Sequence, residues 1–352
     1  MLTARAPGKL IVLGEYAVLD GAPALVQAID RQTEVRVSWR PGRPHRLRAL
    51  PVAPQPVGFD FDRQGRVQWC DDSIGPSLAY VTTLLNALGS PMIGSDGGLD
   101  VVIDTRDCFD ADTGEKLGLG SSAALAVALA GAWQALASGP GRTDPAPRDC
   151  LDRMIALHRD IQGGQGSGAD VAASVFGGLI AYRPGAMAEV ESLVVPEGVE
   201  WMWIWLGRSA STTNFLAGMA GYRHRRGDDC QRRMATMADL AEAGLRAVRR
   251  ADGSALLAII DAYGRAMADL GEAAGLPIWT DDHRRLAQWA TRHGIAFKPS
   301  GAGGGDIAMA AATDIDALAG LARHARTSGY RVLPLAASRA GLHLQWHTAS
   351  ES

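Results

Sequence analysis

The chain has few cysteines, and they show no spacing that would build a site. Cys70, Cys108, Cys150 and Cys230 lie far apart in 352 residues, with no C-x-x-C pair. No histidines stand at metal-ligand spacing either. These absences exclude a disulfide-bonded scaffold and a structural zinc module. They predict reduced thiols, as in a cytoplasmic protein.

The chain also lacks an excess of charge of one sign. Its 35 Lys and Arg against 38 Asp and Glu give a net charge of −3, which is too balanced for a polyanion-binding protein. We therefore expect no nucleic-acid partner. The basic runs 40–48 and 223–226 are interpreted as a proline-rich surface loop and a solvated helix end. The sequence leaves room for a homodimer.

Long apolar runs are scarce. The N-terminus has no apolar core of the kind found in signal peptides. Residues 117–141 carry no charge and are long enough on paper to span a bilayer. Because both ends are rich in Gly, Ser and Pro and the centre is rich in alanine, we predict a buried helix and no membrane partner.

An apolar content of 47% over 352 residues suffices for two domains. We place them at 1–190 and 191–352. The apolar patterns predict strands at 10–13, 25–28, 33–39, 100–104, 178–182, 201–206, 295–298, 307–311, 330–334 and 341–346. They predict helices at 76–87, 122–136, 227–250, 254–274, 281–293 and 314–327. The alternating tryptophans of 201–206 are predicted to pack in a core.

A glycine-rich loop precedes the alanine-rich segment. Residues 116–124 read Lys-Leu-Gly-Leu-Gly-Ser-Ser-Ala-Ala. Small residues let backbone N–H groups approach an anion, and a helix N-terminus adds a partial positive charge. The loop is therefore predicted to bind phosphate, although a serine-capped buried helix would read similarly.

Two more glycine loops favour the phosphate interpretation, at 162–170 and 298–306. No segment has the G-x-x-x-x-G-K-[ST] pattern of a Walker loop. The G-x-G-x-x-A match at 118–123 lacks the flanking strands of a dinucleotide-binding fold. Neither common nucleotide motif explains the three loops.

The three loops resemble those of the GHMP small-molecule kinase superfamily over nearly the whole chain. The first motif corresponds to 6–20, the second to 117–124 and the third to 298–306, and these three segments are named the first, second and third glycine loops. Gly168-Ala169-Asp170 lies between the last two. The resemblance implies an α/β fold of two α+β lobes around a cleft. The N-terminal lobe would be similar to ribosomal S5 domain 2, and the C-terminal lobe would be ferredoxin-like.

Within the superfamily, Tyr16, Lys116 and the Pro-Ser and final Asp of 298–306 look most like the phosphomevalonate kinases. This implies ATP-dependent phosphorylation of (R)-5-phosphomevalonate, with Mg²⁺, in the mevalonate pathway of isoprenoid biosynthesis. A mevalonate kinase, an ATP-dependent decarboxylase of the same pathway and a nucleotide-binding module without chemistry remain alternatives.

The resemblance and the loop chemistry together assign the site. Lys9 and Asp170 are the expected catalytic residues. ATP is expected at Lys116, Gly118, Leu119, Gly120, Ser121, Ser122 and Ala123. The acceptor is expected at Lys9, Tyr16, His158, Ser167, Gly168, Ser211, Thr212, Lys298, Ser300, Gly301, Ala302 and Gly303. Ser121 is expected to contact Mg²⁺; Glu15 either supports Mg²⁺ or holds its loop.

The identity of the acceptor decides the role of Asp170. A mevalonate hydroxyl must lose a proton, and Asp170 would then be a general base. A phosphomonoester has a second pKa of about 6 and is already mostly ionised at pH 7. With that acceptor Asp170 would mainly position its neighbours, and Lys9 and other cations would matter more.

Overall fold

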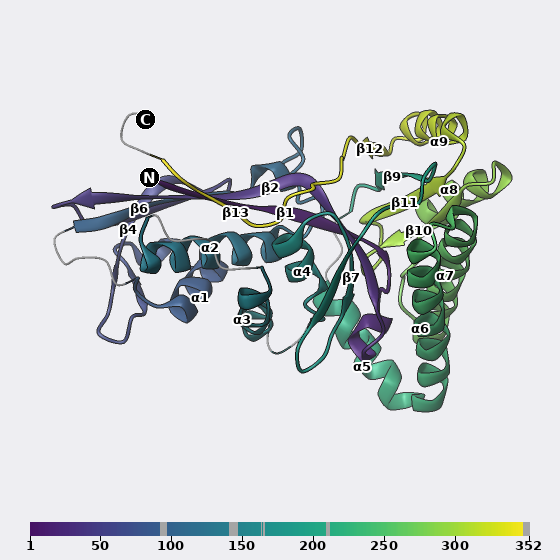
Figure 1. Ribbon diagram of the computed structural model, residues 1–352, viewed down its shortest axis with the longest axis horizontal. Helices are drawn as coiled ribbons and strands as arrows, with labels where there is room; N and C mark the ends of the chain where they lie inside the picture. Colours follow the sequence, from purple (N-terminus) through teal and green to yellow (C-terminus); the bar gives the residue numbers. More distant parts are fainter. Residues whose placement is uncertain (92–96, 141–146, 163, 165, 209–211, 348–352) are drawn as a thin grey trace.

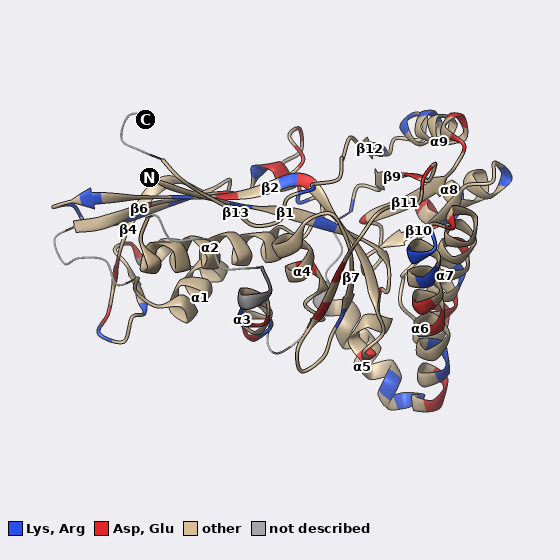
Figure 2. Ribbon diagram, in the orientation of Figure 1, with Lys and Arg blue, Asp and Glu red and all other residues tan. Residues whose placement is uncertain are grey.

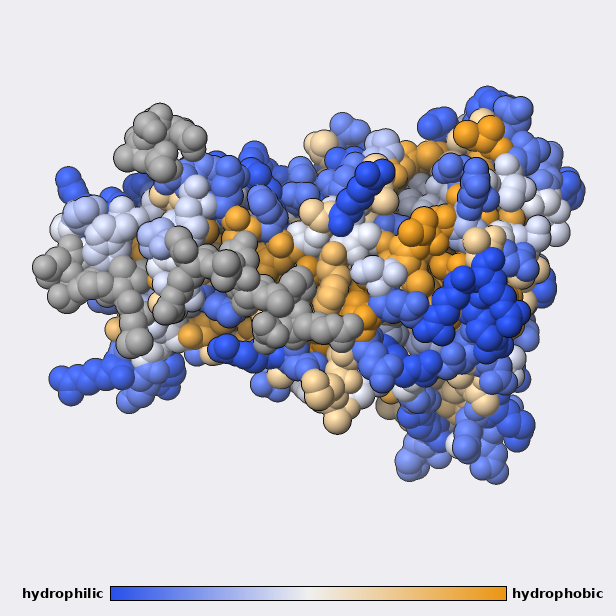
Figure 3. All heavy atoms as spheres, viewed as in Figure 1, coloured by the Kyte–Doolittle hydropathy of each residue, from blue (hydrophilic) through white to orange (hydrophobic). Residues whose placement is uncertain are grey.

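The computed structural model describes residues 1–91, 97–140, 147–162, 164, 166–208 and 212–347. The chain forms two lobes, each a sheet covered by helices (Figure 1). Polar residues cover the margins of the face in Figure 3, and apolar residues show chiefly in the middle of the molecule.

The larger sheet belongs to the first lobe. Its main path is β13-β1-β2-β6-β3-β4-β5, and β7 pairs with both β2 and β8. The strands are β1 (Leu2–Leu13), β2 (Ala24–Pro41), β3 (His45–Leu50), β4 (Ala53–Phe61), β5 (Val67–Trp69), β6 (Gly97–Asp104), β7 (Leu179–Arg183), β8 (Glu189–Leu193) and β13 (His343–Trp346). The last strand of the chain thus pairs with the first, antiparallel.

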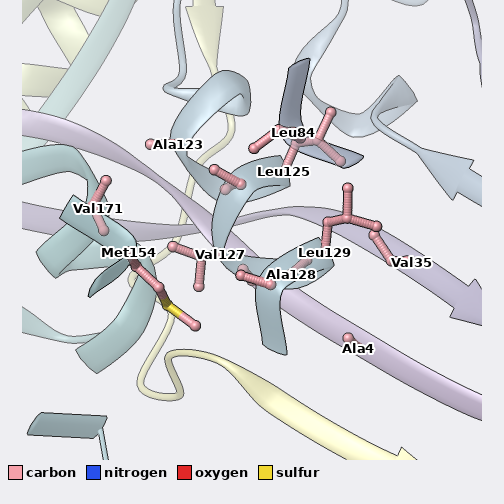
Figure 4. Close-up of a cluster of buried hydrophobic side chains, with 14 of the residues drawn as sticks. Ala4, Val35, Leu84, Ala123, Leu125, Val127, Ala128, Leu129, Met154 and Val171 are labelled. Atoms are coloured by element: carbon pink, nitrogen blue, oxygen red, sulfur yellow. The ribbon is translucent and has the colours of Figure 1, made fainter. Parts of the chain in front are cut away.

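Four helices cover one face of this sheet: α1 (Ala79–Leu88), α2 (Ser121–Ser138), α3 (Pro147–Ile161) and α4 (Ala169–Phe176). Helix α2 lies at the centre of the core, where Leu125 and Leu129 meet side chains from the sheet and from the neighbouring helices (Figure 4). No charged residue lies on α2 (Figure 2). An apolar helix of this kind is stable only when it is buried on all sides.

Helix α2 is also, in the described part of the chain, the one helix long and apolar enough to cross a membrane by length and composition. Of that 18-residue window, 72% is buried inside the protein. Gly131, in its middle, lies against the side chain of Leu342, which would have to shift to make room for a Cβ. The predicted buried helix is confirmed.

The second lobe has a four-stranded sheet in the order β10-β11-β9-β12. Its strands are β9 (Glu200–Trp205), β10 (Ala296–Ser300), β11 (Ile307–Ala312) and β12 (Arg331–Leu333). All the pairings are antiparallel. This strand order and these directions are those of the ferredoxin-like lobe that was expected. The mixed α/β fold class predicted from sequence is confirmed.

Helices pack on both faces of this second sheet, α7 (Gly253–Ala274) on one face and α8 (Asp281–Arg292) with α9 (Ile315–Thr327) on the other. Helix α6 (Gly227–Arg249) packs against α7, and α5 (Thr212–Arg225) packs against α6 and α7. Trp203 and Trp205 face the core that contains α6 and α7, and Ile204 faces the core that contains α8 and α9. The alternation on β9 therefore reflects two buried faces, and the predicted core role of the tryptophans is confirmed.

The sequence patterns missed β3, β4, β5, β8, α3 and α5. The prediction of a surface loop at 40–48 is wrong in part, because Arg40 and Pro41 belong to β2 and 45–48 belong to β3. Only the turn between these strands is a loop. The run 223–226 is an exposed helix end, as predicted. The proposed domain boundary at residue 190 falls within β8.

A buried ion pair joins the two lobes. The ammonium of Lys298 on β10 contacts the carboxylate of Glu15, which follows β1. Their side chains are 0% and 1% exposed. The Lys298 Nζ also donates to the Pro299 carbonyl at 2.8 Å. Burial lowers the pKa of Lys298, and the Glu15 carboxylate opposes that shift. The pair fixes the third glycine loop against the first.

We expect Lys298→Met to destabilise the protein by about 3–5 kcal/mol, because it leaves the Glu15 charge buried without a counter-ion. The double variant Glu15→Leu/Lys298→Met should recover part of that loss. The exposed pair Arg265–Asp261 on α7 is the matched control, and Arg265→Ala should cost less than about 1 kcal/mol. Denaturant unfolding measures all three. Equal losses for Lys298→Met and Arg265→Ala would contradict the argument.

A second prediction concerns His283, which is buried in the first turn of α8. Its Nδ1 accepts the backbone N–H of Thr280 at 3.2 Å, and burial lowers its pKa to about 3. As pH falls below about 6.5 the unfolded chain takes up this proton first, so stability is lost. His283→Gln keeps the capping box but removes the titrating group.

The free energy of unfolding of the wild type should therefore fall more steeply between pH 7 and 5 than that of His283→Gln. The single group contributes up to about 1.4 kcal/mol per pH unit. His224→Gln, at an exposed position on α5, is the control. A stability difference between His283→Gln and wild type that does not change with pH would rule this out.

Candidate active site

A cavity of about 520 Å³ lies where the two lobes meet. Segments that are far apart in the sequence line it: the end of β1 with the loop after it, the second glycine loop, the loop before α4, helix α5 and the third glycine loop. The lining residues with polar or ionisable side chains, which could bind a ligand or take part in chemistry, are Lys9, Glu15, Tyr16, Gln162, Ser167, Asp170, Ser300 and Asp306. The three glycine loops predicted from sequence thus converge on one cavity.

The second glycine loop is tied to β1 beside this cavity. The Lys9 N–H donates to the Leu119 carbonyl at 2.8 Å, and Gly8 lies so close that a Cβ there would be 2.5 Å from the same oxygen. The Lys9 side chain runs along Gly120, where a Cβ would be 3.0 Å from its Cγ. Gly120 has a φ of +79° and precedes α2. The left-handed conformation favours glycine here, and a Cβ would also require the Lys9 side chain to shift.

The Asp306 side chain lies against Gly118 in the way that the Lys9 side chain lies against Gly120. A Cβ on Gly118 would collide with the Asp306 carboxylate. Burial raises the pKa of Asp306 from 3.8 to about 7, and Lys9 and Lys116 oppose this shift. Its Oδ1 is buried with no hydrogen-bond partner. The two glycines of the loop are therefore faced by a cation and by a carboxylate.

Asp170 faces the cavity from the first turn of α4. Gly168, not Asp170, occupies the N-cap, and the Asp170 Oδ1 accepts the Val171 N–H at 2.9 Å. The preceding loop is held from behind, because Arg159 and Tyr182 both donate to the Ser167 carbonyl, at 2.6 Å each. The helix-cap alternative for Asp170 is excluded, and its carboxylate is free to meet a ligand with its other oxygen.

The third glycine loop is fastened to the first by side chains expected to bind substrate. The Tyr16 hydroxyl donates to the Ala302 carbonyl, and Tyr16 itself has a φ of +62°, which is strained for a tyrosine. The Ser300 hydroxyl donates to the Ile11 carbonyl at 2.9 Å and accepts its N–H at 3.2 Å. Tyr16, Ser300, Gly301 and Ala302 all line the cavity.

Three of the expected residues are buried and already engaged by other groups of the protein. Lys298 is fully buried against Glu15, so it acts through the loop rather than by touching a ligand. His158 is 2% exposed inside α3, where its Nε2 lies 3.3 Å from the Gln162 amide nitrogen. Glu15 lines the cavity but is engaged by Lys298, and it accepts the Gly301 N–H at 3.4 Å, which favours its loop-holding role.

Of the residues expected to bind ATP, Gly118 lines the cavity. Leu119 and Ala123 are buried in the cores, Ser121 is buried at the start of α2, and Lys116 is exposed beside the loop. The other expected residues that do not line the cavity are Gly120, Ser122, Gly168 and Gly303. Ser211 and the Thr212 side chain lie outside the described residues.

Sequence reasoning missed Asp306, Gln162 and the α5 residues Phe215 and Leu216 as parts of the cavity wall. The signal for Asp306 was present, since it ends the third glycine loop. Nothing in the pattern around 215 distinguishes a cavity-lining helix from an ordinary one.

In the described part of the chain, no group of three or more His, Cys, Asp or Glu side chains could hold a metal. A Mg²⁺ ion that binds with a nucleotide does not need such a group, because the phosphates and one or two carboxylates suffice.

Known proteins with similar sequences and structures agree with this architecture. The family described as GHMP kinases N terminal domain matches residues 79–178. The phosphomevalonate kinase of Streptomyces sp. (strain CL190) is 32% identical over 340 residues, and the match covers 87% of this chain and 88% of the Streptomyces chain. The mevalonate kinase of Aeropyrum pernix is 28% identical over 314 residues, covering 86% of each.

A solved structure, Streptococcus pneumoniae phosphomevalonate kinase in complex with phosphomevalonate and AMPPNP, has a TM-score of 0.77 at 16% identity. The match covers 96% of this chain and 100% of that one, and it shows the shared fold. The Streptomyces match, at 32% identity over 87% of this chain, shows the family as well as the fold. The chain belongs to the GHMP kinase family and is a kinase of the mevalonate pathway.

Proposed function

We propose that this kinase phosphorylates (R)-5-phosphomevalonate with ATP to give (R)-5-diphosphomevalonate. The observation that carries the proposal is the meeting of Lys9 and Asp170 with the three glycine loops around one cavity. The choice of acceptor is supported by the 32% identity to a phosphomevalonate kinase, which exceeds the 28% identity to a mevalonate kinase.

The reaction needs positioning and charge neutralisation more than proton transfer. An acceptor phosphate is already mostly dianionic at pH 7. Lys9, held beside the second loop by its backbone bond to Leu119, stabilises the charge on the transferred phosphoryl group. Asp170, on the rigid start of α4, orients the acceptor and Lys9 rather than removing a proton.

Mg²⁺ fits the site because a buried carboxylate oxygen, Oδ1 of Asp306, lies beside the phosphate loop without a partner. When bound, the ion neutralises phosphate charge. Ser121, which was expected to hold it, stands at the first position of α2 next to the same loop. Glu15 fits less well, since Lys298 already engages its carboxylate.

Mevalonate kinase activity is the second candidate, favoured by the mevalonate kinase relatives and by the carboxylate of Asp170 at the cavity. A hydroxyl acceptor would make Asp170 a general base. The two functions differ in the pH dependence that they predict for Asp170 variants.

The first test compares acceptors. We expect kcat/KM for phosphomevalonate to exceed that for mevalonate by about a hundredfold or more, because a charge-paired phosphate contributes about 3 kcal/mol. ADP release with phosphomevalonate, mevalonate and diphosphomevalonate measures this, with CO₂ release as the control for decarboxylation. A preference for mevalonate would establish the second candidate.

The second test separates Lys9 from Asp170. Lys9→Ala should lower kcat severely at every pH, because its charge is needed in the transition state. Asp170→Asn should lower the rate but keep the shape of the rate–pH profile, since no proton passes through the carboxylate. If Asp170→Asn abolishes an acidic limb distinct from the titration of the acceptor, Asp170 is a general base and the acceptor is a hydroxyl.

A further inference from the structure

The charged side chains around the cavity do not balance the charge of a nucleotide. Among the described lining residues, Lys9 is a cation, and Glu15, Asp170 and Asp306 are carboxylates. Lys298 neutralises Glu15 by direct contact. One ammonium and two carboxylates therefore remain to meet a ligand that is itself polyanionic. Such a ligand needs a further cation at the point where its phosphates come closest to a carboxylate.

That point is Asp306. Its carboxylate lies against Gly118, inside the loop where the phosphates are expected. Its Oδ1 is buried without a hydrogen-bond partner, and no ion pair involves Asp306 in the described structure. A buried carboxylate oxygen left unsatisfied is costly, and it is tolerated where a ligand completes it.

The other two carboxylates are less suited to this role. Glu15 also leaves one oxygen, Oε2, without a partner, but its charge is balanced by Lys298. Asp170 uses one oxygen to accept the Val171 N–H, and it stands in the first turn of α4 rather than at the second glycine loop. Lys9 and Lys116 act on the Asp306 carboxylate only without direct contact. Among these three carboxylates, Asp306 alone combines an orphaned oxygen, no direct ion pair and contact with the phosphate loop.

We propose that Asp306 is a ligand of the divalent cation that accompanies the nucleotide, joining the third glycine loop to the phosphates held by the second. The inference rests on the proposed function only in that a nucleotide occupies this cavity. A single carboxylate with phosphate oxygens and water is a common Mg²⁺ environment. The cation would also remove the repulsion between Asp306 and the phosphates.

Binding of AMPPNP, measured by calorimetry with Mg²⁺ and with EDTA, tests this without turnover. In the wild type Mg²⁺ should tighten binding strongly. In Asp306→Asn this advantage should shrink by about tenfold or more, as expected for loss of a metal ligand. Metal-free binding should not weaken, because a negative charge is gone. Asp269→Asn, at an exposed position on α7, should behave like the wild type.

A change of metal preference provides the second measurement, and it does not depend on how well the asparagine variant folds. Asp306→Cys places a thiolate where Cd²⁺ is preferred over Mg²⁺. AMPPNP binding by this variant should be restored by Cd²⁺ and not by Mg²⁺. Asp269→Cys controls for adventitious thiol binding, and the wild type controls for the exposed native Cys70.

The outcomes are distinct. If wild-type protein does not bind AMPPNP under any condition, the proposed nucleotide site is wrong. If it binds with a Mg²⁺ advantage that Asp306→Asn preserves, or if Cd²⁺ fails to rescue Asp306→Cys, Asp306 is not a ligand. If Asp306→Asn tightens binding equally with and without Mg²⁺, the carboxylate acts by its charge alone, and the proposal is likewise overturned.

Discussion

The contact between Lys298 and Glu15 is the constraint on which the rest of the site depends. It buries two opposite charges between β10 and the loop after β1, where only each other and nearby backbone groups can satisfy them. The hydrogen bonds of Ser300 to Ile11 and of Tyr16 to Ala302 lie beside it. Together they fix how the third glycine loop faces the first, and so where Asp306 meets Gly118.

Much of the fold followed from local patterns. The long helices α6 and α7 have strong apolar periodicity, and their ends were predicted to within a residue. Strand β4 was not predicted because two prolines and a glycine interrupt it. Strand β3 was not predicted because arginines alternate with its apolar residues and its other partner, β6, is distant in the sequence, and β5 was not predicted because it has only three residues. Helix α3 was not predicted because about half of its residues are charged or polar, which obscures the apolar pattern of its buried face.

The site was predictable as a set of loops but not as a set of contacts. Glycine spacing indicated where backbone approaches closely, and the structure shows what fills the space, namely the side chains of Lys9 and Asp306. Sequence could not show that Lys298, in the middle of β10, points inward to Glu15, because a lysine side chain usually reaches solvent. Which of two neighbouring polar residues meets the cavity depends on tertiary packing.

The return of β13 to the edge of β1 makes the second lobe an insertion within the first. The chain passes between the lobes twice, once after β8 and once before β13, and Ser338 and Ala336 bond to the strand β2 on the way back. Both ends of the second lobe are therefore attached to the sheet of the first lobe, at two separate points. These two covalent connections add to the contact between Lys298 and Glu15, so the walls of the cavity are joined both through the chain and through a buried ion pair.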